Sequence, residues 1–261
     1  MTSKPVPKPV PAQASYRNFK LTLEYEGTHF CGWQFQPGLR TVQGHLEEKL
    51  ARIFKKKVSC HASGRTDSGV HALAQVVHFK VHTAVDPVII HKALNDFLDR
   101  DLSVLSVEEV HHDFHSQYHV KQKTYRYTIL NRPAPSALWR DRAYFYPYKL
   151  NVAKMRRAAL ALKGRRDFKA FQAASQQAKV SSTVKNVRAL RVAKEGDFIH
   201  ITITSDGFLH KMVRNIAGAL LAVGSGSLAP DAIPKLLKSK DRTLLPKTAP
   251  GHGLCLMTVT Y

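Results

Sequence analysis

Residues 64–72, GRTDSGVHA, combine an acid, a base and two glycines in one short turn. Gly64 and Gly69 can adopt backbone angles closed to other residues, so the segment between them can turn tightly and approach a substrate. Asp67 then lies at the apex of a loop, where it could act as a nucleophile or base, or could cap its own backbone in an Asx turn. Arg65 could neutralise that carboxylate, clamp a phosphate or fill the gap left by an extruded base. The other polar side chains are expected to serve the loop itself: Thr66, Ser68 and His71.

A second group of candidates lies on residues 207–226, which have helical periodicity. Large apolar residues would bury one side of this helix: Phe208, Met212, Ile216 and Val223. A second stripe combines basic and small residues at spacings of three and four: Lys211, Arg214, Asn215 and Gly218. Such a stripe faces either solvent or something negative. If Arg214 meets Asp67, its guanidinium would favour the ionised carboxylate that a nucleophile requires.

Two further groups invite a chemical interpretation. Tyr125 and Tyr127 share one face of a predicted strand. They are either core residues or rings that stack on a base, and such stacking stabilises binding by about 1–3 kcal/mol per base. His111, His115 and His119 have a spacing that suits a metal, but no Cys joins them and the segment resembles a crossover between domains. The sequence also contains no Walker loop and no Rossmann glycine pattern. We therefore expect neither a metal nor a cofactor.

The elements that must position these residues follow from hydrophobic periodicity. The first half predicts the order β-α-β-β-α-β, over residues 21–25, 42–53, 58–61, 77–81, 86–97 and 102–107. The second half predicts the same order with one insertion, over residues 124–130, 152–162, 187–192, 198–204, 208–223 and 254–260. Asp86 followed by Pro87 is a good helix start, because the acid can cap the helix and the proline suits its first turn.

This pattern predicts an α+β protein of two ferredoxin-like halves, residues 16–115 and 116–261. Their strands are expected to join into one continuous antiparallel sheet. Helices would cover one face of that sheet and leave a long basic cleft on the other.

The charge of the chain favours a polyanionic partner. Of its 261 residues, 40 are Lys or Arg and 19 are Asp or Glu, which gives a net charge of +21. Residues 149–166 alone hold seven basic residues and no acidic one. Because phosphate contacts release counterions, we favour nucleic acid over a uniformly basic composition without function.

The rest of the composition indicates in which compartment the protein is expected. No apolar run is long enough to span a membrane. The first 15 residues are rich in proline, which predicts a disordered tail rather than a signal peptide. Three isolated cysteines fit neither a disulfide scaffold nor a zinc site and favour a reducing cytoplasm: Cys31, Cys60 and Cys255.

Six blocks, taken in order, resemble the signature blocks of the bacterial tRNA pseudouridine synthase A family. They are residues 25–34 (YEGTHFCGWQ), 41–43 (TVQ), 64–72 (GRTDSGVHA), 123–127 (KTYRY), 207–214 (GFLHKMVR) and 249–254 (APGHGL). The resemblance implies a homodimeric enzyme without a cofactor. It also implies that this enzyme isomerises uridine to pseudouridine at positions 38, 39 and 40 of the tRNA anticodon stem-loop.

The resemblance assigns roles to single residues. Asp67 matches the essential aspartate, Tyr125 the active-site tyrosine and Arg214 the basic partner of the aspartate. Arg65 matches the arginine that assists base flipping, and Leu254 matches an apolar residue beside the flipped base. We therefore expect a catalytic set and an RNA-binding set: Asp67, Tyr125 and Arg214 in the first, and Arg65, Lys211, Asn215 and Leu254 in the second.

One block departs from the family pattern. Members commonly read Phe-x-Ala-Arg before the tyrosine strand, whereas residues 114–117 read FHSQ here and place Gln117 where the arginine would be. One phosphate or structural ion-pair contact is therefore in question. Lys121 and Lys123 lie close enough in sequence to compensate for it.

Two other classes of protein remain as alternatives. A catalytically silent RNA-binding or tRNA-folding module would keep the basic cleft, but a carboxylate close to phosphates would repel RNA and argues against it. A metal-dependent nuclease would need a second acid beside Asp67, and the surrounding residues 64–72 offer none.

Overall fold

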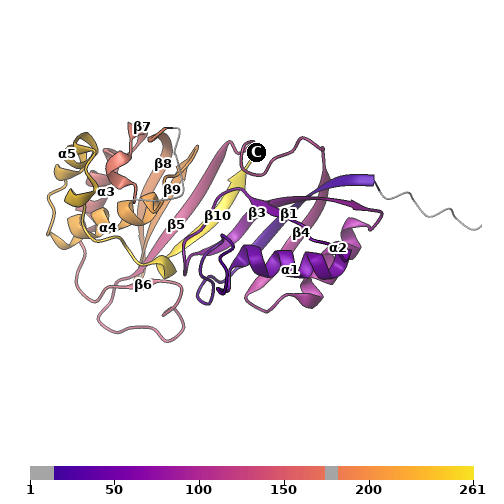
Figure 1. Ribbon diagram of the computed structural model, residues 1–261. Coiled ribbons are helices and arrows are strands. Elements are labelled where there is room, and N and C mark those ends of the chain that lie inside the picture. The colour runs from indigo at the N-terminus through magenta and orange to yellow at the C-terminus, as the bar shows by residue number, and fades with distance from the viewer. Residues whose placement is uncertain (1–14, 174–181) are drawn as a thin grey trace, which may run out of the picture.

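One sheet of ten strands runs through the described chain (Figure 1). The computed structural model describes residues 15–173 and 182–261. The predicted tail of residues 1–15 therefore lies outside the described residues, apart from Ser15. No helix in these two ranges is long and apolar enough to cross a membrane.

The first half of the chain has the predicted order of elements. They are β1 (Ser15–Tyr25), α1 (Val42–Phe54), β2 (Cys60–Ala62), β3 (His71–Thr83), α2 (Pro87–Phe97) and β4 (Leu102–Val110). Asp86 caps α2 as predicted, because its carboxylate accepts a hydrogen bond from the Val88 N–H at 2.7 Å. Thr41 caps α1 in the same way by accepting from the Gly44 N–H.

The second half repeats this order with insertions. The repeated elements are β5 (Gln122–Leu130), α3 (Val152–Leu160), β8 (Val184–Glu195), β9 (Phe198–Ser205), α4 (Met212–Ser225) and β10 (Leu254–Thr260). The inserted elements are β6 (Tyr144–Phe145), β7 (Gly164–Asp167), η1 (Lys169–Phe171), α5 (Ala232–Ser239), η2 (Arg242–Leu244) and η3 (Gly251–Gly253). Helix α4 starts four residues later than its periodicity predicted, because Lys211 adopts a left-handed conformation (φ 57°) just before it.

The order of strands in the sheet is β4-β1-β3-β10-β5-β9-β8-β7, with β2 beside β3 and β6 beside β5. The expectation of a continuous antiparallel sheet is wrong at the join between the halves, where β3 and β10 run parallel through Cys255–His71 and Leu256–Ala72. Parallel neighbours start at the same edge of a sheet. The loops that precede β3 and β10 are therefore brought together at one end of the join.

The helices of both halves pack on the same face of the sheet. The strand register aligns Tyr25 with Ala72, Ala72 with Leu256 and Leu256 with Tyr125, and all four side chains are buried. Aligned residues point to the same face, so the apolar core continues across the join. Figure 1 shows α1 and α2 at one end of the sheet and α3, α4 and α5 at the other.

The segment between β4 and β5 is anchored to the opposite face by a buried serine and histidine. The Ser116 N–H donates to Nδ1 of His78 at 3.2 Å, and the Ser116 hydroxyl donates to the carbonyl of His61 at 2.6 Å. Burial, with smaller contributions from His115, His61 and Lys80, lowers the pKa of His78 from 6.5 to about 4. The imidazole is therefore neutral in the folded protein at neutral pH.

We expect this histidine to make the protein less stable in mild acid. The unfolded chain binds a proton at His78 near pH 6.5 and the folded chain only near pH 4. The neutral His78 thus makes its full contribution to the free energy of unfolding above pH 6.5. This contribution, at most about 3 kcal/mol, is lost as the pH falls toward 4. Urea denaturation of a His78→Gln variant should show a shallower loss in this window, whereas exposed His82→Gln in the same strand should not. Equal slopes for all three proteins would contradict the assignment.

Candidate active site

Asp67 and Arg214 meet between the two halves of the chain, as the sequence predicted. The Arg214 Nη1 donates to Oδ2 of Asp67 at 2.7 Å, and the Arg214 Nε donates to the carbonyl of Ala249 at 2.8 Å. The side chains of Asp67 and Arg214 are 22% and 16% exposed, so the ion pair is only partly screened by water. Arg214 is therefore held by two contacts whose directions a guanidinium can satisfy together.

The pair lies beside the helices and not in a cleft on the other face of the sheet. Arg214 belongs to α4, and the aromatic ring of Phe208, just before α4, packs against Tyr125 on the helix-covered face. The expected basic cleft on the opposite face is thus not where the structure brings Asp67 and Arg214 together. The ion pair lies on the helix-covered face because Arg214 belongs to α4, which packs on that face.

The loop that carries Asp67 is held by the segment that follows β1. The Trp33 N–H donates to the carbonyl of Thr66 at 3.0 Å, and the hydroxyls of Tyr25 and Thr66 lie 2.9 Å apart. Gly32 has a φ of +84°, and a Cβ at this position would lie 2.7 Å from the carbonyl oxygen of Thr66. Only glycine allows this approach. Residues of the block at 25–34 therefore hold the Asp67 loop in place.

His71 closes the same turn, which confirms the structural role expected for it. Its Nδ1 accepts a hydrogen bond from the Gly27 N–H at 2.9 Å, so Nε2 carries the proton in the neutral ring. This Nε2 lies 3.0 Å from the carbonyl of His252 and can donate to it. The imidazole thus links the start of β3 to the segment before β10.

His210 is a neighbour of the carboxylate that the sequence reasoning did not single out. Its Nε2 lies 3.6 Å from Oδ1 of Asp67, and its side chain is 39% exposed. The available signal was its place in the block at residues 207–214, four positions before Arg214. Periodicity could not assign it a direction, because α4 starts only at Met212.

Tyr125 lies on β5 close to this carboxylate. Its side chain is 7% exposed, and its ring meets the edge of Phe208 with centroids 5.1 Å apart. Burial raises the pKa of Tyr125 well above its usual range, and the charges of Tyr25 and Asp67 add to the effect. The hydroxyl is therefore protonated at neutral pH and can donate a hydrogen bond.

Leu254 lies on the same face of the sheet, one strand away. It is buried at the start of β10 and is aligned with Tyr127 on β5. The Tyr127 hydroxyl donates to the carbonyl of Pro250 at 3.0 Å, which fixes the chain just before Leu254.

The residues expected to bind RNA are placed differently from one another. Arg65 is exposed, and Lys211 is partly exposed just before α4. Asn215 is only 1% exposed: its amide donates to the carbonyl of Phe171 at 2.7 Å, and its oxygen accepts from Thr248 and Arg242. The expectation that Asn215 contacts RNA is therefore wrong, because its hydrogen-bonding groups are used inside the protein. Within the stripe to which it belongs, Asn215 and Gly218 face the segment at residues 247–249.

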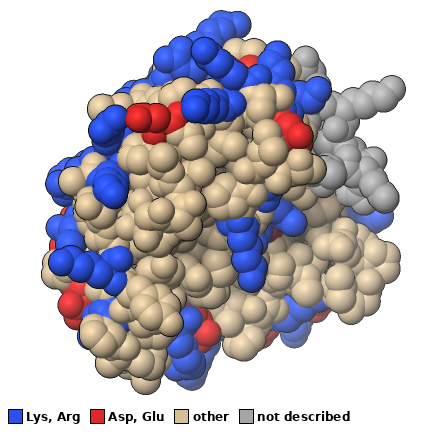
Figure 2. Space-filling view, turned by 90° about the vertical axis from the view of Figure 1, so that its left-hand side faces the viewer, with Lys and Arg blue, Asp and Glu red and all other residues tan. Residues whose placement is uncertain are grey.

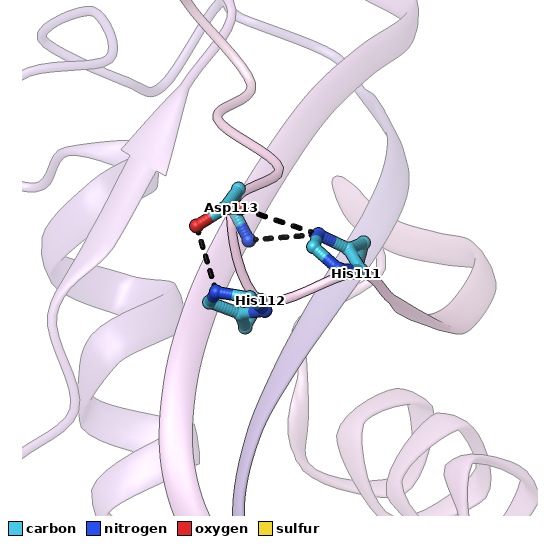
Figure 3. Close-up of side chains that lie close together, drawn as sticks. All are labelled: His111, His112 and Asp113. Carbon is cyan, nitrogen blue, oxygen red and sulfur yellow. Dashed lines mark hydrogen bonds and ion pairs between the residues drawn. The ribbon is translucent and has the colours of Figure 1, made fainter.

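One group of three potential metal ligands occurs in the described ranges, and Figure 3 shows it. The ligand atoms of His111, His112 and Asp113 lie within 4.8 Å of one another, and all three residues are exposed. His115 does not join them, because its ring packs 4.6 Å from that of His78. Zinc sites take four ligands that outer hydrogen bonds orient. Three neighbours on one exposed turn do not fit that pattern, so we assign them no role in the reaction.

The end of the molecule that carries α3, α4 and α5 shows more Lys and Arg than Asp and Glu among its charged side chains, while much of this face is uncharged (Figure 2). Gln117, which replaces the arginine of the family pattern, is exposed, as is Lys121. Lys123 is instead partly buried and donates to the carbonyl of Ser63 at 2.7 Å.

A carboxylate oriented by a guanidinium, next to a protonated tyrosine, can serve as a nucleophile or base, and the net charge of +21 favours a polyanionic substrate. Comparison with known proteins specifies the class further. The sequence model of the tRNA pseudouridine synthase family matches residues 22–119 and 158–261. The chain belongs to this family.

Named relatives extend over almost the whole chain. The tRNA pseudouridine synthase A of Caldicellulosiruptor bescii is 43% identical over 245 residues, which are 94% of this chain and 100% of that protein. The protein of the same name from Clostridium acetobutylicum is 41% identical over the same shares of both chains. That from Anaplasma marginale (strain Florida) is 40% identical over 93% of this chain and 99% of its own.

The position of Asn215 predicts a defect in folding and not in RNA binding. Asn215→Ala should lower the free energy of unfolding by about 1–3 kcal/mol, because it leaves the buried carbonyl of Phe171 without its donor and removes the acceptor of the Thr248 hydroxyl. Ser225→Ala, at the exposed end of the same helix, should change it by less than about 0.5 kcal/mol. Urea denaturation measures both. If the Asn215→Ala protein had normal stability but bound tRNA more weakly, the structural role would be wrong and a contact between Asn215 and RNA would be supported.

Proposed function

We propose that this protein isomerises uridine to pseudouridine in tRNA, at positions 38, 39 and 40 of the anticodon stem-loop. The observation that carries the proposal is the ion pair between Asp67 and Arg214, formed across the two halves of a member of the tRNA pseudouridine synthase family. The relatives that share 40–43% of its residues over nearly the whole chain are named for this activity.

The reaction requires one ionised carboxylate and no redox partner. The bond between N1 and C1′ of uridine breaks, the base rotates, and a bond forms between C5 and C1′. The proton on C5 leaves and N1 gains one, so atoms and electrons balance within the substrate and water. Asp67 either attacks C1′ to form an ester or removes the 2′ proton to give a glycal-like intermediate. Both routes start from the ionised carboxylate.

The neighbours of Asp67 suit these steps. Arg214 orients the carboxylate and offsets its charge at a site that RNA phosphates approach. Tyr125 offers a ring to the detached base, and its hydroxyl can take part in loss of the C5 proton once a base accepts its own proton. Leu254 supplies an apolar wall, which helps to retain a free base. Arg65 is exposed on the Asp67 loop, where it can fill the gap in the RNA helix.

The proposal includes the wider properties that the family resemblance implied. Each half would be a ferredoxin-like unit, which the strand orders β4-β1-β3-β2 and β10-β5-β9-β8 support. The protein would work as a homodimer in the cytoplasm, without a cofactor or metal.

Release of tritium from uridine C5 tests the reaction directly. Purified protein and unmodified tRNA labelled at C5 should release tritium to water in the presence of a chelator. Asp67→Asn should lower the rate by at least about 1000-fold, because the group that reacts at the ribose is lost. The variant should still retard tRNA on a gel, and Asp231→Asn, an exposed change, should keep the normal rate.

The results separate the candidate functions. Release by Asp67→Asn at the normal rate would remove the role of Asp67. Failure of the unmodified protein to release tritium from several tRNAs that it binds would favour the silent RNA-binding module.

The geometry of Arg214 gives a second prediction. Arg214→Lys keeps the charge but cannot reach both the carboxylate of Asp67 and the carbonyl of Ala249 in the same directions. We expect kcat to fall by about 10- to 100-fold through misplacement of the acid, with a smaller change in KM. Single-turnover kinetics with labelled tRNA measure the chemical step. A normal kcat would show that only the charge at this position matters.

A further inference from the structure

Lys123 crosses from the second half of the chain to the loop that carries Asp67. Its ammonium donates to the carbonyl of Ser63 at 2.7 Å. It also lies against Gly64, where a Cβ would be only 2.6 Å from Nζ, so a larger residue would displace it. An ammonium has three donors, and this contact uses one of them.

A second lysine lies near the first. Lys185 is on β8, and its side-chain carbons and ammonium lie 3.6–3.9 Å from the Cβ position of Gly207. Burial and, to a smaller extent, the charge of Lys185 together lower the pKa of Lys123 from 10.5 to about 8. Both lysines are only partly accessible to water, so the repulsion between them is poorly screened.

No ion pair in the described parts of the chain involves either lysine, although Asp206 lies nearby and accepts a hydrogen bond from the Asn186 N–H. Within residues 15–173 and 182–261, no carboxylate lies within ion-pair distance of Lys123 or Lys185: the described ion pairs involve other residues. The two stretches that the structure does not describe contain no Asp or Glu. Cations that are partly withdrawn from water are usually compensated by an anion. An anion from outside the chain can supply this compensation at Lys123 and Lys185.

The position of the lysine pair relates it to the proposed reaction. Lys123 is two residues before Tyr125 and shares its face of β5. The register aligns Lys123 with Ser205 on β9, and Ser205 with Val187 on β8, two residues after Lys185. The two ammonium groups therefore lie on the face of the sheet that carries Asp67 and Arg214.

We propose that Lys123 and Lys185 form a phosphate site that holds the RNA backbone next to the uridine presented to Asp67. This inference rests on the proposed function, because it assigns the RNA backbone as the source of the phosphate. A phosphate between the ammonium groups supplies the missing negative charge and accepts the unused donors of Lys123. Because Lys123 also holds the carbonyl of Ser63, the same contact ties the backbone of the RNA to the start of the Asp67 loop.

Neutral phosphate analogues can test this site. Anticodon stem-loop RNAs are prepared with one methylphosphonate at each phosphate within two nucleotides of the target uridine, and dissociation constants are measured for Lys185→Met. This variant leaves the contact between Lys123 and Ser63 in place. The matched control is Lys194→Met, an exposed lysine on the same strand, roughly 30 Å away along β8.

At one phosphate, the methylphosphonate should weaken binding to the unmodified protein by about tenfold. The same substitution should cost Lys185→Met less than about twofold, since the partner is already absent, whereas Lys194→Met should keep the full loss. Lys185→Met should also reduce the slope of log Kd against log salt by about 1.

The outcomes distinguish this inference from the proposed function. Equal losses in the unmodified and Lys185→Met proteins at every phosphate would overturn the phosphate site, even if pseudouridine forms. Suppose that the methylphosphonate weakens binding to the unmodified and Lys194→Met proteins but not to Lys185→Met, and that no pseudouridine forms. This result would support the phosphate site and refute the proposed activity. Failure to bind any stem-loop would refute both.

Discussion

The contact between Asp67 and Arg214 is the interaction on which the candidate site depends. A cation in the first turn of a helix is disfavoured by the helix dipole, and Arg214 is the third residue of α4. The negative charge of Asp67 offsets this unfavourable interaction of Arg214 with the helix dipole, and the Arg214 guanidinium in turn orients the Asp67 carboxylate. Because each partner comes from a different half, the site exists only when both halves are folded and joined.

The join itself explains why loops far apart in sequence meet there. Strands β3 and β10 run parallel, so the Asp67 loop and the segment before Leu254 start from the same edge. His71 then links them through Gly27 and His252. Several residues that mark the family blocks thus contact the protein backbone. Their identities are set by the close approach of two loops and a helix, and the chemistry is left to a few side chains.

The sequence predicted most elements and the central contact, and its failures share a physical cause. Alternation and capping are local, so β10 and the Asp86 cap of α2 were placed correctly. The start of α4 was missed because apolar spacing continues through a turn that Lys211 interrupts with a positive φ. The parallel join and the burial of Asn215 depend on partners more than 25 residues away, about which periodicity carries no information.

Two charge arrangements on the same face of the sheet differ in a way that bears on binding. Asp67 and Arg214 neutralise each other within the chain, whereas Lys123 and Lys185 carry two charges of the same sign at a partly dry site. A protein that needed only stability would gain from an acid or an apolar residue at either lysine. The repulsion is instead retained next to the residues proposed to react. It lowers the stability of the free protein slightly, and a phosphate held between the two ammonium groups would relieve it, so part of the free energy lost in the free protein would be recovered on binding.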